Sequence, residues 1–510
     1  MRIDNIKLRI DEDETRLREI VEKKLRGRCH YLKILKKSLD ARDNSDIRWV
    51  YSVDADLKPK KEVKIVLSQT NASEKRIVIV GSGPAGLFCA VRLVDRGFKP
   101  IILERGGSVE ERVKQNKRFF KEKILDENCN IQFGEGGAGT FSDGKLNTQT
   151  NSPLNHDVLE IFVRFGAPEE ILYLNKPHIG SDNLQKILVN IRKYIIERGG
   201  NFYFHQKFCG IKMKDGALFA VNSENTKSGE INEIPADILV LAIGHSSRDT
   251  FKMLFDSGMF MEQREFAVGF RIEHLQEKIG YAQYSAWHKL LPPADYKLVS
   301  HAGERTVFTF CMCPGGYVIP SASEFGGVVT NGMSNYARDG INANSAVLAQ
   351  VKKEDFGSHV LDGVEFQRKI EQAAFLAGGS DFSAPVQRVE DFLNGKKSCG
   401  FGDVLPTYSA GVTFFDLNKL FEEKISYSLR SGIVDMDRRL KGFADPDAVL
   451  TGVETRFSSP VRIVRGDNFE SITHPGVFPC GEGCGYSGGI TSSAADGLRI
   501  AERIFDKFSD

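Results

Sequence analysis

The sequence lacks the features that mark a membrane, secreted or nucleic-acid-binding protein. Its longest apolar run, "ILVLAI", is far below the roughly 20 residues that a membrane-spanning helix needs. The first residues, "MRIDNIKLRIDEDE", are charged from the second position, so we expect no signal peptide. Lys and Arg number 69 and Asp and Glu 68, a balance that favours neither a nucleic-acid binder nor an acidic, solvating chain.

Paired cysteine motifs are also missing. The nine cysteines are scattered without a C-x-x-C pair, which fits reduced thiols in the cytoplasm better than a disulfide framework. Two of them, Cys311 and Cys313 in "CMC", should lie on one face of a strand, but two thiols lack the third and fourth ligands of a zinc site. We therefore predict a cytoplasmic protein without a membrane segment or a structural metal.

The length of 510 residues predicts two to four domains. Residues 1–73 read as a small α+β unit of β-α-β-β pattern, followed by the polar linker "LSQTNASEK". This unit has 18 basic and 13 acidic residues, an excess that could indicate RNA binding. Because the charges are mixed and no aromatic stacking pattern accompanies them, nucleic acid is the less favoured partner, and we predict a docking or stabilising domain whose partner is unknown.

The rest of the chain predicts an α/β protein in three further segments. Residues 74–250 alternate strands and helices around a polar stretch that runs to about residue 155. Residues 251–447 have short strands such as "FAVGFRIEH" and "TVFTFCMC" between glycine-rich loops, which predicts an inserted mixed α+β substrate domain. Residues 448–510 return to a strand, a glycine turn and a helix, and should complete the first domain.

The stretch "RIVIVGSGPAGLFCAVRLVDRGFKPIILER" meets every requirement of the dinucleotide-binding fingerprint. Gly81 permits the tight turn, Gly83 lets the backbone approach a pyrophosphate, and Gly86 lets the helix pack on the sheet. Glu104 ends the second strand, where an acidic residue accepts hydrogen bonds from a ribose. These residues predict a Rossmann-type domain, but they do not distinguish NAD from FAD.

A second G-x-G-x-x-G lies in "QFGEGGAGTFSDGKL", at Gly134, Gly136 and Gly139. Only "NIQF" precedes it, and the residues after it are poor helix formers, so it cannot open a second Rossmann helix. Either the backbone approaches a ligand closely there, or the segment is a flexible surface loop.

The tail "GVFPCGEGCGYSGGITSSAADGLRIA" allows two further interpretations. Its G-x-S-x-G at Ser487 could be a hydrolase nucleophile elbow, but Ser487 lies seven residues beyond Cys480 rather than directly after a strand. Cys480 and Cys484 could be a redox pair, although inert thiols are the favoured interpretation.

Both glycine motifs and the tail resemble those of a bacterial family of FAD-dependent dehydrogenases of unassigned substrate, within the glutathione-reductase-type flavoproteins. The resemblance extends over most of the chain, in "KPHIGSDNL", "LAIGHSSRDT", "CPGGYVIPSASE", "TNGMSNYARDGINANSA" and "TGVETRFSSPVRI". It implies one FAD, bound by the Rossmann-type domain, with the second glycine loop beside it and the tail closing over it. The implied cofactor contacts are Gly81, Gly83, Pro84, Ala85, Gly86, Glu104, Arg105, Gly136, Gly137, Ala138, Gly139, Thr140, Phe208, Ala242, Gly244, Gly481, Glu482, Gly488, Gly489 and Ile490.

Chemistry at a flavin needs a positioned C–H bond, a group that stabilises an anion and a group that moves a proton. The candidate catalytic residues are Lys145, His178, Arg271, His274 and Arg456. Arg271 and His274 occupy odd and even positions of one strand, so only one of them can face a ligand. Arg456 could bind the carboxylate of a substrate, and could equally pair with an acidic residue of the protein.

Three hypotheses follow for the function. The leading one is an FAD-dependent oxidoreductase that transfers a hydride between a small-molecule substrate and flavin N5. The first alternative is an NAD(P)H-dependent flavin reductase or hydroxylase, in which the pyridine nucleotide docks transiently. The second alternative is a flavin-stabilised RNA- or protein-binding protein without turnover.

Overall fold

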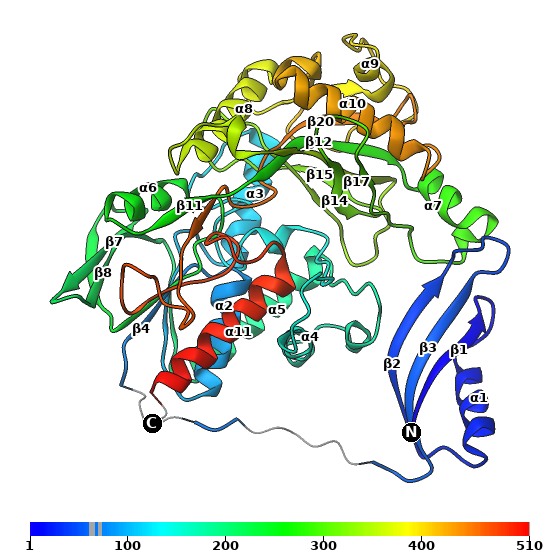
Figure 1. Cartoon of the computed structure of the whole chain (residues 1–510), viewed down its shortest axis with the longest axis horizontal. Helices are drawn as coiled ribbons and strands as arrows, with labels where there is room; N and C mark the ends of the chain where they lie inside the picture. Colours follow the sequence, from blue (N-terminus) through cyan, green and yellow to red (C-terminus); the bar gives the residue numbers. More distant parts are fainter. Residues whose placement is uncertain (61–66, 70–73, 509–510) are drawn as a thin grey trace.

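The computed structural model describes residues 1–60, 67–69 and 74–508, so the predicted linker at 67–75 lies partly outside the described residues. The N-terminal unit has the predicted β-α-β-β pattern: β1 (Arg2–Arg9), α1 (Thr15–Leu25), β2 (Tyr31–Asp40) and β3 (Arg48–Asp56) (Figure 1). Its antiparallel sheet has the order β1-β3-β2. The edge strand β2 contacts the main body, where the Lys37 amide donates a hydrogen bond to the Tyr173 carbonyl at 2.8 Å.

A five-stranded parallel sheet of order β22-β10-β4-β5-β6 forms the centre of the Rossmann-type domain. Its strands are β4 (Ile77–Val80), β5 (Ile101–Leu103), β6 (Asn201–Tyr203), β10 (Ile238–Leu241) and β22 (Val477–Pro479). The helices of this domain are α2 (Pro84–Asp95), α3 (Val109–Glu122), α4 (Leu154–Arg164), α5 (Ser181–Glu197), α6 (Arg248–Asp256) and α11 (Ile490–Lys507). The confirmed fold class is therefore α/β.

Strand β4 shows why this sheet has two buried faces. All four of its residues are buried. Ile77 and Ile79 pack among α2, α5 and α11, whereas Val78 and Val80 pack under a second, three-stranded sheet. That sheet has the order β7-β8-β9, with β7 (Gln206–Lys214), β8 (Ala217–Asn225) and β9 (Ile231–Pro235). Because strand side chains alternate between faces, the apolar run "IVIV" requires a cover on each side.

A seven-stranded mixed sheet, which we call the cap sheet, lies above the Rossmann-type domain in Figure 1. Its order is β13-β14-β17-β12-β20-β18-β19, with β12 (Phe266–Leu275), β13 (Val299–Ser300), β14 (Val307–Cys313), β17 (Asn342–Val351), β18 (Ala384–Arg388), β19 (Val412–Phe414) and β20 (Val449–Glu454). The accompanying elements are α7 (Gln276–Tyr284), α8 (Asp362–Gly378), α9 (Val389–Leu393), α10 (Glu423–Asp437), the pair β15 (Tyr317–Pro320) and β16 (Thr330–Met333), and the pair β11 (Met261–Gln263) and β21 (Val461–Ile463).

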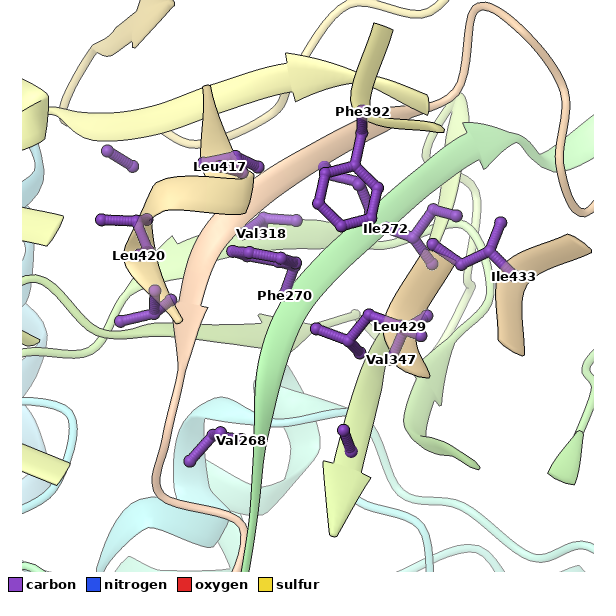
Figure 2. Close-up of a cluster of buried hydrophobic side chains, with 14 of the residues drawn as sticks. Val268, Phe270, Ile272, Val318, Val347, Phe392, Leu417, Leu420, Leu429 and Ile433 are labelled. Carbon is purple, nitrogen blue, oxygen red and sulfur yellow. The ribbon is translucent and has the colours of Figure 1, made fainter. Parts of the chain in front are cut away.

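The two faces of the cap sheet have different neighbours. Val268, Phe270 and Ile272 of β12 point into an apolar core built with residues of α9 and α10 (Figure 2). Arg271 lies between them in sequence, and its side chain therefore emerges on the opposite face, toward the Rossmann-type domain. His274 lies on the core side, where it packs against Phe443 at a ring-centroid distance of 5.3 Å.

Two features differ from the sequence interpretation. The polar stretch after residue 105 contains a helix, α3, whose Ser108 and Glu111 form a capping box. The cap sheet also includes β20, which follows the boundary that we predict at residue 447, while α6 crosses the boundary predicted at 250. Within the described residues, none of the helices combines the length and the apolar character required to span a bilayer.

Candidate functional site

A cavity of about 330 Å³ lies between the Rossmann-type domain and the cap sheet. One end is lined by both glycine loops and by the N-terminal ends of α2 and α11. The other end is lined by side chains of the cap, including Phe310, Cys311, Asn331, Glu454 and Phe457. The cavity thus follows the carboxyl ends of parallel strands, which is where open α/β sheets bind ligands.

The first glycine loop has the geometry of a nucleotide cradle. A Cβ atom on Gly81 would lie 2.3 Å from the Ala242 carbonyl oxygen, and one on Gly86 would lie 2.0 Å from the Gly81 oxygen. Both glycines are therefore needed to pack the turn itself. A Cβ atom on Gly83 would have only the Gly137 Cα atom within 4 Å, at 3.8 Å. Gly83 also caps α2 without a side-chain hydrogen bond, so the backbone there is open to a phosphate group.

Glu104 ties the two glycine loops together. Its carboxylate accepts hydrogen bonds from the Ser82 amide at 3.0 Å, the Ser82 hydroxyl at 2.7 Å, the Gly106 amide at 3.0 Å and the Gly134 amide at 2.9 Å. These four donors match the acceptor capacity of a carboxylate. Ribose binding by Glu104 stays a prediction, and it requires the carboxylate to exchange or share one of these bonds.

The second glycine loop is a buried structure organised by Arg112 of α3. The guanidinium group donates to the Asn130, Ile131 and Gly137 carbonyls at 3.0–3.1 Å. A Cβ atom on Gly134 would lie 2.2 Å from the Arg112 Cδ atom, so a glycine is required where the arginine enters. The segment is therefore not the flexible surface loop that the sequence left open, and it begins no Rossmann helix: only a short 3₁₀ turn (Ala138–Phe141) follows it.

The two loops meet at Gly83 and Gly137. A Cβ atom on Gly137, whose φ is +60°, would lie 3.0 Å from the Gly83 Cα atom. This approach leaves one concave backbone surface from the first loop to the second. A flat or phosphorylated ligand can lie against such a surface because no side chain separates it from the peptide groups.

The N-terminus of helix α11, in the C-terminal part of the chain, lies at the same cavity. Helix α11 crosses α2 so closely that a Cβ atom on Gly497 would lie 2.1 Å from the Ala85 carbonyl oxygen. Asp496 accepts a hydrogen bond from the Gly481 amide at 2.9 Å, which anchors the turn before the helix. Gly489 is the N-cap of α11 and makes no side-chain hydrogen bond to the helix. The dipole of α11 therefore favours negative charge at this end of the cavity.

The predicted cofactor contacts divide into two groups. Gly86, Gly136, Thr140 and Gly481 lie beneath the cavity surface and do not line it, whereas the other residues of the predicted set line the cavity. His245, which the resemblance places beside the cofactor, lines the cavity. Sequence reasoning missed several other lining residues, namely Gln132, Phe133, Asn147, Ser246, Ser247, Phe310, Asn331, Glu454 and Phe457. The predicted strand "TVFTFCMC" signals the element that carries Phe310, whereas Gln132, Phe133, Asn147, Ser246, Ser247 and Phe457 come from loops.

Lys145 and Arg456 are the two catalytic candidates that line the cavity. The Lys145 ammonium group lies 3.8 Å from Asp295. The Arg456 guanidinium group binds the buried Glu371 through Nε at 3.1 Å and Nη2 at 2.9 Å. Burial opposes ionisation of Glu371, but Arg248 and Arg456 hold its pKa below the ordinary value. The two guanidinium N–H groups that could bind a substrate carboxylate are therefore bound to Glu371. This agrees with the alternative that Arg456 pairs with an acid of the protein.

The other three catalytic candidates do not line the cavity. His178 is stacked on Tyr336 and bonds its carbonyl group at 3.0 Å. His274 is fully enclosed in the cap core and bonds the Phe443 carbonyl at 2.8 Å. Burial lowers the pKa of both histidines, which favours their neutral form. Arg271 lies directly behind the cavity wall, where it contacts three lining residues, Cys311, Asn331 and Glu454.

Arg271 and Glu454 form a second buried charge pair at the cap end of the cavity. The Arg271 Nε atom lies 2.8 Å from a Glu454 carboxylate oxygen, and Nη2 lies 3.1 Å from the Asn331 side-chain oxygen. Burial raises the pKa of Glu454 to about 7, with Arg271 opposing that shift. Glu454 can therefore be present in both protonation states near neutral pH, which is the requirement for a group that exchanges protons.

The cysteines of the tail differ from a reactive pair. Burial raises the pKa of Cys480 far above its ordinary range and that of Cys484 to about 12. Both thiols stay protonated near neutral pH, which agrees with inert thiols. Among the described residues, no group of three or more His, Cys, Asp or Glu side chains could hold a metal ion.

Comparisons with known proteins give matches over the whole chain. A family model described as "FAD-dependent protein, C-terminal domain-like" matches residues 265–457, a model of an NAD(P)-binding Rossmann-like domain matches residues 79–120, and a domain of unknown function matches residues 1–56. An uncharacterized protein of Clostridium beijerinckii is 43% identical over 535 residues, which cover 100% of this chain and 99% of the relative.

Solved structures resemble the chain at low sequence identity. The flavin-dependent brominase Bmp2 matches with a TM-score of 0.40 and 11% identity, over 85% of this chain and 79% of that chain. A glycerol-3-phosphate dehydrogenase from Bacillus halodurans, complexed with FAD, matches with a TM-score of 0.37 and 10% identity, over 86% and 65%.

Proposed function

Because this chain belongs to the family of its Clostridium beijerinckii relative, a family of FAD-dependent proteins of the oxidoreductase type, we propose that it is a dehydrogenase that transfers a hydride between a small-molecule substrate and flavin N5. Its cofactor is FAD. The observation that carries the proposal is the continuous cavity, which runs from two uncapped helix N-termini to polar side chains of the cap.

Bound FAD supplies the two-electron chemistry, and the chain supplies position, charge and proton transfer. The backbone at Gly83 and the N-terminus of α2 suit the pyrophosphate, and the N-terminus of α11 suits negative charge on the flavin ring. The aromatic side chains of Phe310 and Phe457 line the cap end, where they would exclude water from a bound substrate.

We assign two roles at the cap end. The Lys145 ammonium group would hold an anionic group of the substrate or stabilise negative charge that develops in the reaction. The Glu454 carboxyl group would take or return the substrate proton, because its pKa of about 7 permits both states. Both residues line the cavity, whereas His178 and His274 do not.

The proposal is tested first by FAD content and then by anaerobic reduction. The purified protein should be yellow, should release FAD on denaturation, and should lose its flavin absorbance when mixed with a small-molecule substrate from a metabolite screen. NADPH that bleaches the flavin at the turnover rate would instead support the reductase or hydroxylase alternative. A protein that takes up no FAD, or whose flavin no metabolite reduces, would contradict the dehydrogenase.

A matched pair of lysines tests the assigned role of Lys145. Lys145 and Lys176 both lie near Asp295, at 3.8 Å and 2.6 Å, but only Lys145 lines the cavity. We expect Lys145→Met to lower the rate of flavin reduction by about 100-fold, the usual effect of removing a group that stabilises developing charge. Lys176→Met should leave the rate near that of the wild type, and equal losses in the two variants would contradict the assignment.

A further inference from the structure

Strand β14 ends in two cysteines that belong to neither the cofactor cradle nor the roles assigned above. Cys311 lines the cavity, and Cys313 is fully buried behind it. The pairing of β14 with β17 shifts register between Phe310 and Cys313, so Cys311 lies in a bulge and Cys313 pairs again with β17 beyond it. Cys311 has a φ of +45°, a left-handed conformation that a residue with a side chain adopts at a cost of about 1 kcal/mol or more.

The two cysteines interact with each other. The Cys313 thiol donates a hydrogen bond to the Cys311 carbonyl oxygen at 3.3 Å, and its interaction with the Cys311 thiol is the main cause that lowers the pKa of Cys311. In a regular strand, the Cβ atoms of residues two apart are separated by about 6.6 Å, more than the roughly 3.5–4.5 Å that a disulfide spans. The bulge and the left-handed conformation of Cys311 take the pair out of that geometry, and closing an S–S bond requires the two Cβ atoms to approach each other.

Charges around the pair favour one thiolate and one thiol. The Arg271 guanidinium group donates to the Cys311 carbonyl at 2.7 Å and is held by Glu454 on its other side. The hydrogen bond from the Cys313 thiol, together with Arg271 and Lys145, lowers the pKa of Cys311 to about 6 against the effect of burial. The same hydrogen bond and burial raise the pKa of Cys313. A thiolate beside a protonated thiol is the state from which dithiols are oxidised.

The neighbouring residues make space for a polar centre. A Cβ atom on Gly332 would lie 2.8 Å from the Arg271 guanidinium carbon, so glycine is required where β16 passes over the arginine. Asn344, opposite Cys313 in the β14–β17 register, is fully buried, and neither atom of its side-chain amide has a partner among the described residues. Its N–H groups are available to a sulfur atom whose charge changes.

We propose that Cys311 and Cys313 are a redox-active dithiol that exchanges an electron pair with the bound FAD. An S–S bond forms between the two sulfur atoms while the S–H bond of Cys313 breaks. Bound FAD would serve as the oxidant that accepts both electrons and the proton, and the reverse transfer would reduce the disulfide. Cys480, which also lines the cavity, lacks this chemistry because burial keeps it protonated.

The inference uses FAD binding but not hydride transfer from a small molecule, so an electron count without substrate tests it separately from the proposed function. The oxidised holoprotein is titrated anaerobically with dithionite until the flavin is bleached and no more reductant is consumed. We expect the wild type to consume twice as much dithionite per flavin as Cys313→Ser. Cys399→Ser is the matched control, since Cys399 is exposed and lies outside the cavity, and it should consume as much as the wild type.

A measurement on the wild type guards against a variant that fails to fold. The tryptic peptide 306–338 contains Cys311 and Cys313 and no other cysteine. After free thiols are blocked in denaturant, this peptide should be lighter by two hydrogen atoms and unblocked in the oxidised holoprotein, and doubly blocked after reduction. Equal dithionite consumption in the wild type and Cys313→Ser, or two free thiols in the oxidised holoprotein, would overturn the proposal.

Discussion

Replacing Gly83 by alanine separates FAD binding from folding. Gly83 has φ −72° and ψ −177°, which alanine adopts without strain. The nearest atom to the added Cβ would be the Gly137 Cα atom at 3.8 Å, an ordinary contact. The protein itself therefore tolerates the methyl group, whereas a pyrophosphate that approaches the backbone here does not.

The expected loss can be estimated from that geometry. Forcing a methyl group against a closely packed neighbour costs about 1–3 kcal/mol, which corresponds to a rise of about 5- to 150-fold in the Kd of FAD. The Kd is measured by flavin fluorescence on the apoprotein, and the Tm of the apoprotein is measured alongside. Gly83→Ala should weaken FAD binding and leave the apoprotein Tm unchanged or slightly higher, because alanine restricts the unfolded chain.

Gly86→Ala is the matched comparison. Its Cβ atom would lie 2.0 Å from the Gly81 carbonyl oxygen, so it should lower the apoprotein Tm through a clash within the protein. The reasoning is refuted if Gly83→Ala binds FAD as the wild type does, or if it destabilises the apoprotein as much as Gly86→Ala.

Three further variants test the packing and the buried charges. Gly497→Ala should lower the free energy of unfolding by about 1–3 kcal/mol or more, seen in urea melts, because its Cβ atom would lie 2.1 Å from the Ala85 carbonyl oxygen; an unchanged midpoint would contradict the close crossing of α2 and α11. Glu371→Gln leaves two buried arginines without their shared carboxylate and should cost about 3–5 kcal/mol in the same assay; a cost below 1 kcal/mol would mean that they find other partners. Burial raises the pKa of Glu273 to about 7, so it destabilises the native state progressively as pH rises from about 4.5 to 7. Relative to Glu273→Gln, the wild type should therefore lose about 3 kcal/mol between pH 4.5 and 8, and parallel pH profiles would show that Glu273 ionises normally.

Local sequence patterns were sufficient for the parts of the site that depend on backbone geometry. The fingerprint at Gly81–Gly86 needs a buried strand, a tight turn and a helix within one short segment, and β4 and α2 form where these residues predict them. The sequence also predicted that no Rossmann helix follows the second glycine motif, since the residues after Gly139 are poor helix formers. The resemblance of these motifs to a flavoprotein family identified FAD as the cofactor.

The side chains at the cap end could not be assigned in this way. Period-two alternation showed that Arg271 and His274 lie on opposite faces of β12, but not which face meets the cavity. That choice depends on α9 and α10, which cover the His274 side with an apolar core. Arg456 likewise looked available to a substrate until Glu371, far from it in sequence, proved to hold its guanidinium group.

The sequence by itself determined the nucleotide-binding strand, turn and helix, because these arise from short-range sterics and apolar periodicity. Only the tertiary structure decided that Arg112 shapes the second glycine loop, that Glu104 joins the two loops, and that Cys311 and Glu454 line the cavity. The physical reason is that burial and charge pairing depend on which distant segments pack together. A residue's chemistry at the cavity is therefore set by neighbours that its local sequence does not contain.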